Sequence, residues 1–235
     1  MIKYFFSATF FLLLHCISSL HASIVIIGTR HIYLSNQDFI SVDLKNVGNA
    51  PSLVQSWVDS KDTIADPTTT TAPFIITPPI TKIDADKGQS LRIIFNKTQS
   101  LALDRETLFW LNILDIPAKP KTEQNYLQFA IRNRIKLFFR PNNLPISQQQ
   151  AFENLKVAQI NKTTLTINNS SPYYINFAKS HVIDSKNLTK EIPEILMMDP
   201  FSEIKVNIDV ANKIQSVELS IITDYGNITK VKKSL

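Results

Sequence analysis

The chain of 235 residues carries 25 basic and 20 acidic side chains, a formal net charge of +5, with four glycines and one cysteine. Its basic residues are spread along the whole length, without a glycine-rich loop or an aromatic RNA-binding motif, which argues against nucleic acid as a partner. The length is that of one large or two ordinary domains.

The N-terminus has the pattern of a secretory signal peptide, predicted to cover residues 1–22. Lys3 precedes the apolar run 4–14, which is too short to span a bilayer comfortably, and cleavage is expected after Ala22. Cleavage would remove Cys16, so the mature chain must rely on core burial and not on disulfides. An uncleaved N-terminal anchor is the alternative. No later run approaches transmembrane length, so no membrane insertion of the mature chain is expected.

Short apolar or alternating runs separated by turn-forming residues predict β-strands along the rest of the chain. The first set comprises residues 23–29, 39–44, 52–58, 74–77, 90–95 and 107–114, followed by a longer run at 127–139. The segment 142–155 has the composition of a linker leading into a short helical turn. A second set comprises 155–160, 163–169, 173–178, 203–210 and 216–224. This pattern predicts an all-β fold of two immunoglobulin-like β-sandwich domains, residues 23–142 and 143–235.

The longest predicted strand has one apolar and one largely basic face, because its residues alternate with a period of two. The apolar face carries Leu127, Phe129, Ile131, Asn133, Ile135, Leu137 and Phe139, and the other face carries Arg132, Arg134, Lys136 and Arg140. Such a strand would extend roughly 43 Å, longer than most strands in globular proteins. The periodicity alone favours packing against the core of its own domain, and leaves open that part of the strand pairs with another protein.

No constellation of residues predicts an active site. The mature chain has two histidines, His31 and His181, which are far apart in the sequence and have no acidic neighbour in a metal-binding motif. No serine nucleophile elbow is present either. Paired catalytic carboxylates remain open, but the sequence predicts neither an enzyme nor a bound metal or cofactor.

Several motifs occur together in one order along the chain. They are "IIGTRHIYL" (26–34), "SLVQSWVDS" (52–60), "FIITPPITKI" (74–83) with "SLRII" (90–94), "LALDRETLFWLNILDIP" (101–117), "RIKLFFRP" (134–141) and "ITDYGN" (222–227). Together they resemble the periplasmic pilus-assembly chaperones, the PapD-like family. The short connection 118–126 and the absence of a disulfide in the second domain resemble the short-loop branch of that family.

The resemblance implies two sandwiches joined at an angle with a cleft between them. It implies a periplasmic chaperone that binds pilin subunits lacking one strand and delivers them to an outer-membrane usher. Residues 126–140 would be the donated strand, with Leu127, Phe129 and Ile131 as its donor side chains. Phe129 is larger than the aliphatic residues common at that position, and Asn133 interrupts the apolar face without an evident reason.

The resemblance also implies roles for five charged residues. Arg30 and Lys136 would bind the C-terminal carboxylate of the pilin, whereas Glu106, Arg140 and Asp224 would form an ion network across the domain junction. The alternative is that these are ordinary surface charges. At the level of function, the alternative is a secreted immunoglobulin-like structural or adhesive protein. A free chaperone could also self-associate through its edge strand.

Overall fold

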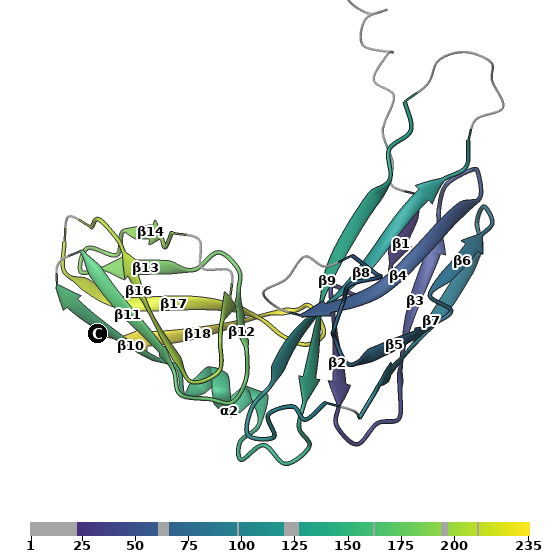
Figure 1. Cartoon of the computed structure of the whole chain (residues 1–235). Coiled ribbons are helices and arrows are strands. Elements are labelled where there is room, and N and C mark those ends of the chain that lie inside the picture. The colour runs from purple at the N-terminus through teal and green to yellow at the C-terminus, as the bar shows by residue number, and fades with distance from the viewer. Residues whose placement is uncertain are drawn as a thin grey trace, which may run out of the picture.

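The computed structural model describes residues 23–60, 66–97, 99–119, 127–161, 163–193, 197–210 and 212–235. The predicted signal peptide with Cys16, residue 126 of the predicted donor strand and most of the connection before it lie outside the described residues. Two β-sandwiches with one short helix make up this part of the chain (Figure 1). The prediction of two all-β domains is therefore confirmed. None of its helices is long and apolar enough to cross a membrane.

The first domain consists of two packed sheets. One sheet has the order β1 (Ile24–Ile26), β3 (Ile40–Asn46), β7 (Gly88–Phe95) and β5 (Phe74–Thr77). The other has the order β2 (Arg30–Leu34), β9 (Ile131–Arg140), β8 (Thr107–Pro117), β4 (Ser52–Ser60) and β6 (Ile80–Ile83). The chain crosses between the sheets after β1, at Gly28, whose φ of 104° few other residues adopt. As a result β2 runs parallel to β9, whereas the other strand pairs of the domain are antiparallel.

Alternating apolar residues of both sheets form the core of this domain. Val42, Leu91, Ile93, Leu111 and Leu137 are completely buried. An aromatic group adds to this core at one end, where the Phe139 ring lies 4.8 Å from that of Phe95 and 6.1 Å from that of Tyr33. The later part of β9 is thus part of its own domain.

The second domain repeats the sandwich with different strand lengths. Its smaller sheet has the order β10 (Lys156–Asn161), β11 (Thr164–Asn169) and β16 (Ser202–Asn207). Its larger sheet has the order β14 (Thr189–Glu191), β13 (His181–Asp184), β17 (Ile214–Ile222), β12 (Ile175–Phe177) and β15 (Met197–Met198), with β18 (Ile228–Ser234) also paired to β17. The expected helical turn is α2 (Gln148–Glu153), which begins with a capping box between Ser147 and Gln150.

Strand β9 is shorter than the sequence pattern predicted. It begins at Ile131, and residues 127–130 are exposed and belong to no strand. The ladder with β8 ends at the pair Asp115 and Ile131, and β8 itself ends at Pro117, which has no backbone N–H to offer further. Ile135 is only half-buried, whereas Phe138 is buried although it lies on the basic face.

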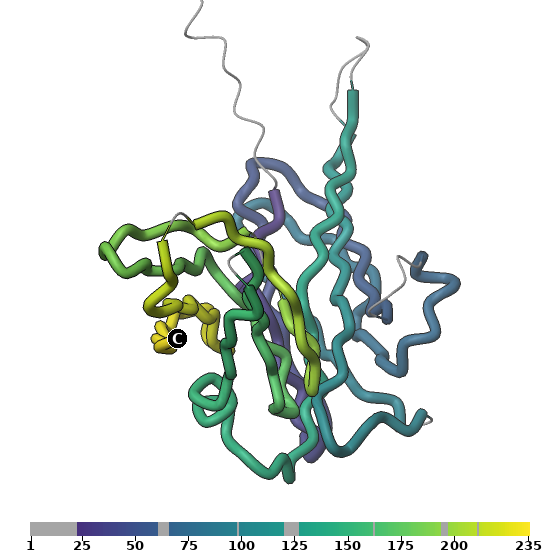
Figure 2. The backbone as a smooth tube through the Cα atoms, turned by 90° about the vertical axis from the view of Figure 1, so that its left-hand side faces the viewer, coloured from purple at the N-terminus to yellow at the C-terminus, as the bar shows by residue number. Residues whose placement is uncertain are grey.

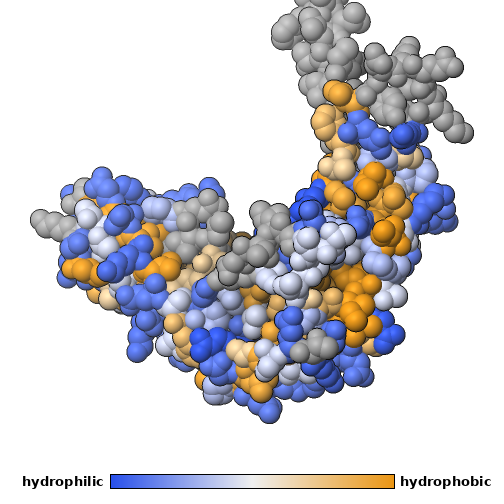
Figure 3. All heavy atoms as spheres, viewed as in Figure 1, coloured by the Kyte–Doolittle hydropathy of each residue, from blue (hydrophilic) through white to orange (hydrophobic). Residues whose placement is uncertain are grey.

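The two domains lie at an angle and meet at one end of each. Figure 1 shows the strands of the first domain running steeply relative to those of the second, and Figure 2, seen from one side, shows the second domain in front of the first. Figure 3 shows the surface hollowed between them. At the junction Leu108 and Phe138 of the first domain pack with Tyr174 of the second. The ring centroids of Phe138 and Tyr174 are 5.4 Å apart. The face of β8 and β9 that carries these contacts is therefore the wall of the cleft.

Candidate functional site

Arg30 and Lys136 lie side by side at the base of the cleft. The parallel register of β2 and β9 makes them direct neighbours, and both are half-buried. Each cation is also in contact with the second domain. Arg30 Nη1 donates to the carbonyl oxygen of Ile222 at 3.2 Å, and Lys136 Nζ donates to Asn176 Oδ1 at 2.5 Å. The structure thus brings the two predicted anchor residues together where the domains meet.

The pair has an excess of positive charge. Burial lowers the pKa of Lys136, and the neighbouring Arg30 lowers it further. Burial also lowers the pKa of Arg30, opposed by the more distant Asp224. Among the described residues neither cation has a carboxylate within 4.0 Å, and both are bound by neutral oxygens. A carboxylate entering here would gain a guanidinium and an ammonium at once, which makes this an anion-binding position.

Arg140 links three parts of the chain at the domain junction. Its Nε donates to Glu106 Oε1 at 2.6 Å, and its Nη1 and Nη2 donate to the two Asp224 oxygens at 2.6 and 3.0 Å. Gln148 of α2 also donates to Asp224, at 2.6 Å. The backbone N–H of Tyr174 donates to the other Glu106 oxygen at 2.7 Å. The three residues of the predicted network are therefore in direct contact across the junction.

The network is largely removed from water. Glu106 is 3% exposed, and burial raises the pKa of its carboxyl group, opposed by the guanidinium of Arg140. Burial alone would lower the pKa of Arg140, but its hydrogen bonds and ion pairs with Asp224 and Glu106 raise it overall. A buried ion pair of this kind stabilises little by itself, but the loss of one partner leaves an uncompensated buried charge.

The three predicted donor side chains extend away from the core. Leu127 is 85% exposed, Phe129 is 59% exposed and Ile131 is 36% exposed. They continue the face of β9 that buries Leu137 and Phe139 inside the first domain. An alternating apolar row that leaves its own core is unusual for a soluble protein and indicates a partner.

The edge of β9 next to these residues is open. β2 pairs with β9 only from Lys136 onward, so among the described strands residues 131–135 pair with β8 alone. Their other edge therefore presents backbone N–H and C=O groups to an incoming strand. Such an edge could also pair with a second copy of the chain.

Several contacts of the site were not predicted from the sequence. Asn176 and Gln148 bind predicted site residues, but each lies in a run whose pattern shows only a strand or a short helix. Arg132 and Arg134 were expected simply on the basic face, whereas they approach the buried Asp59. No periodicity signals such contacts, because the partners are distant in the sequence.

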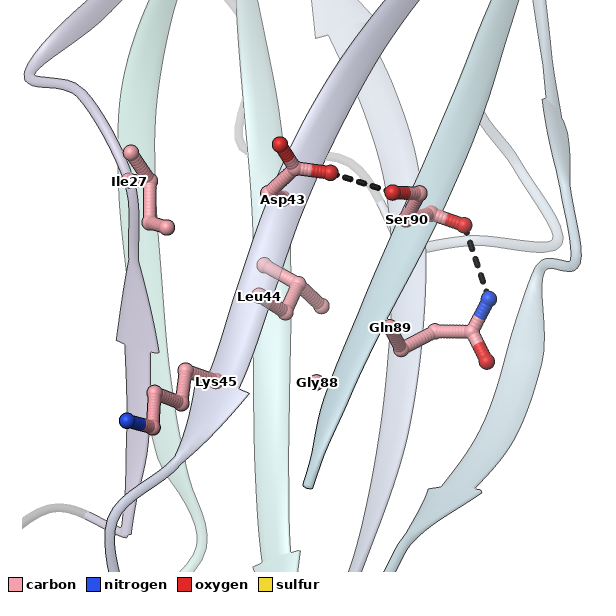
Figure 4. A pocket seen from close by; sticks show the side chains of 7 residues that line it. All are labelled: Ile27, Asp43, Leu44, Lys45, Gly88, Gln89 and Ser90. Carbon is pink, nitrogen blue, oxygen red and sulfur yellow. Dashed lines mark hydrogen bonds between the residues drawn. The ribbon is translucent and has the colours of Figure 1, made fainter. Parts of the chain in front are cut away.

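A separate depression lies on the other sheet of the first domain. It measures about 340 Å³ and is lined by Ile27, Asp43, Leu44, Lys45, Gly88, Gln89 and Ser90. In Figure 4 the side chains of Asp43 and Ser90 hydrogen-bond across β3 and β7, and Gly88 lies further along β7. It contains none of the predicted site residues. In the described part of the chain, no group of three or more metal-ligating side chains occurs.

Comparisons with known proteins identify the family of the chain. The family model for the N-terminal domain of PapD, a pili and flagellar-assembly chaperone, matches residues 23–145, and the model for the C-terminal domain of the pili assembly chaperone PapD matches residues 150–233. The probable fimbrial chaperone YadV of Escherichia coli strain K12 is 40% identical over 220 residues, covering 89% of this chain and 88% of YadV. Chaperone protein HifB of Haemophilus influenzae is 36% identical over 227 residues, covering 94% of this chain and 91% of HifB.

Solved structures give the same result. The crystal structure of the YadV chaperone superposes with a TM-score of 0.78 at 36% identity, covering 91% of this chain and 100% of that one. The SafB chaperone, in the Salmonella enterica complex with the SafA pilin, superposes with a TM-score of 0.78 at 26% identity, covering 93% of this chain and 99% of that one. The chain therefore belongs to the PapD-like family of pilus-assembly chaperones.

Proposed function

We propose that this protein is a periplasmic chaperone that binds pilin subunits by strand donation and delivers them to an outer-membrane usher. The observation that carries the proposal is the exposed alternating row Leu127, Phe129 and Ile131, which leads along an open strand edge to the half-buried pair Arg30 and Lys136. The family membership favours this role over that of a secreted structural or adhesive protein. The predicted signal peptide supports the periplasmic location, and the short-loop branch remains part of the proposal.

Strand donation explains why apolar side chains are exposed here. A subunit that lacks one strand of its sandwich has an open groove, into which a strand with alternating apolar side chains can insert. Burial of three such side chains would contribute at most about 5–9 kcal/mol, before the cost of ordering residues 127–130 is subtracted. The solved complex of SafB with the SafA pilin is consistent with such a partner.

The cation pair would set the register of the inserted strand. We infer that Arg30 and Lys136 bind the C-terminal carboxylate of the subunit, because a carboxylate supplies the negative charge that this position lacks. A slip of one residue would turn the donor side chains away from the groove, so a fixed end is needed. The Arg140 network would hold the angle between the domains, and with it the positions of Ile222 and Asn176 against the two cations.

A co-purification experiment tests the proposal. The chain is expressed in a bacterial periplasm with the pilin subunits encoded near its gene, and the complex is recovered through a tag on the chaperone. Arg30→Ala and Lys136→Ala should each reduce subunit retention by at least about tenfold, the effect expected when a charge-assisted hydrogen bond is lost. Lys179→Ala and Lys230→Ala serve as controls, because both are exposed lysines that form ion pairs within the second domain.

The experiment separates failure of the carboxylate assignment from failure of the proposed function. If the anchor variants are folded and retain the subunit at the level of the controls, the carboxylate assignment is wrong. If the wild-type chain retains no pilin subunit under any condition, the proposed function itself is wrong.

A further inference from the structure

Two arginines of β9 share one buried carboxylate on a strand that is not their neighbour. Arg134 Nη2 lies 2.7 Å from Asp59 Oδ1, and Arg132 Nη2 lies 3.6 Å from Asp59 Oδ2. Asp59 belongs to β4, which is separated from β9 by β8. Its side chain is fully buried, whereas about a quarter of each arginine side chain is exposed. We call these three residues the arginine clamp.

Neighbouring side chains restrict both arginines further. The guanidinium of Arg132 lies 5.0 Å from the ring centroid of Trp57, and its Nε donates to Asn112 Oδ1 at 3.0 Å. The guanidinium of Arg134 lies 4.7 Å from the ring centroid of Trp110. A planar cation that is both stacked and ion-paired has little rotational freedom left. The clamp therefore fixes one face of β9 against β8 and β4.

Among the described residues, the segment that carries the clamp has few other supports. No described strand covers its outer edge, because β2 pairs with β9 only from Lys136. On its apolar face Ile131 is 36% exposed, Asn133 and Ile135 are half-buried, and the domain core begins only at Leu137. Besides the ladder with β8, the arginine clamp is thus a principal side-chain contact of residues 131–135 within the described part of the chain.

We propose that Asp59 is a positioning residue for strand donation. Its charge compensates two cations that lie two positions apart on the same face, and it keeps residues 131–135 flat with their free edge ready to pair. A strand ordered in advance binds more tightly because less freedom is lost on binding. The effect on subunit binding rests on the function proposed above, but the ordering of residues 131–135 concerns the free chaperone alone.

Asp59→Asn is the informative variant, because it keeps the size of the side chain and removes its charge. It also places an amide NH₂ toward one guanidinium, where a donor now meets a donor. Asp184→Asn is the matched control, since Asp184 is a buried carboxylate of the second domain that accepts hydrogen bonds from Lys186, Leu188 and Asn212. Arg134→Gln removes the closer of the two cations, and if both residues act through one contact the double variant Asp59→Asn/Arg134→Gln should be no worse than Asp59→Asn alone.

Hydrogen exchange of the free mature chain tests the ordering. In Asp59→Asn the amides of residues 131–135 that bond to β8 should exchange at least about tenfold faster, whereas the amides of residues 137–139 keep the wild-type rate. Asp184→Asn should leave both groups unchanged, and the double variant should exchange no faster than Asp59→Asn alone. Unchanged exchange in residues 131–135, or an equal acceleration throughout the first domain, would overturn the proposal, since the second result indicates a general role in stability.

Transfer of a bound subunit tests the consequence. Complexes of tagged chaperone with the pilin subunit that co-purifies with the wild type are mixed with excess untagged wild-type chaperone, and loss of subunit from the tag is followed with time. The Asp59→Asn complex should lose its subunit about tenfold faster than the wild type and the Asp184→Asn control. A wild-type transfer rate in a variant with faster local exchange would overturn the role in donation. Failure of the proposed function is distinguished from this, because no wild-type complex would then form.

Discussion

The segment 127–140, which contains β9, has the same sequence pattern at its two ends but opposite surroundings. Leu137 and Phe139 are buried beneath the other sheet of their own domain, whereas Leu127 and Phe129 are on the same face and exposed. The edges differ in the same way, since β2 covers β9 from Lys136 onward and no described strand covers residues 131–135. The apolar alternation therefore identifies a face that needs covering, and only the fold determines which part of it the protein covers itself.

The buried end and the exposed end meet at the pair Arg30 and Lys136. Lys136 lies where β2 begins to pair, directly before the first completely buried residue, Leu137. An anion held there would mark the point at which the chain's own core ends and a partner's core begins. Substitutions at the two ends should therefore separate stability from binding.

The largest effect is expected at the buried end. Leu137→Ala removes a completely buried side chain and leaves a cavity in the first domain, which should lower the free energy of unfolding by about 3 kcal/mol. Denaturant unfolding of the mature chain measures it. A loss below about 1 kcal/mol would mean that this end of β9 is not a fixed part of the core.

The same substitution at the exposed end should act on binding instead. Leu127→Ala should leave the free energy of unfolding within about 0.5 kcal/mol of the wild type, because the side chain is 85% exposed. Binding of a pilin subunit should weaken by about 2 kcal/mol, the value of one leucine buried on insertion. Titration of a purified subunit measures this. Equal binding by wild type and variant would show that Leu127 does not enter the subunit.

The sequence predicted the faces of β9 but not the residue at which the strand begins, and this difference has a physical cause. The period of two correctly assigned the faces of β9, since alternation follows from strand geometry. The start of the strand was predicted four residues too early, because it depends on Pro117 of the paired strand β8. Strand pairing between distant segments is not encoded in local periodicity.

The Arg140 network shows more clearly that contacts between distant residues cannot be predicted from local periodicity. Arg140 contacts residues 34 and 84 positions away, and the grouping of Arg140 with Glu106 and Asp224 came from the family resemblance and not from the pattern. Asp59 received no role in the sequence, because an acidic residue at the end of a strand gives no indication that it is fully buried beneath two arginines. The sequence analysis found one family motif in the second domain, residues 222–227, and Asn176 was missed there.

The smallest expected effect is a pH dependence of the free energy of unfolding. It arises next to Leu137, where the buried end of β9 begins. His31 pairs directly with Leu137 in the parallel ladder, and burial lowers its pKa below the usual 6.5, opposed by Asp43. The folded chain therefore favours the neutral imidazole, so the stability it provides is complete above pH 6.5 and is lost as the pH falls below that value, by at most about 1.4 kcal/mol per pH unit. His31→Gln should flatten this part of the profile, measured by denaturant unfolding at pH 8, 6 and 5. An identical slope in wild type and variant would assign the loss to other groups, whereas a reduced slope would assign it to protonation of His31.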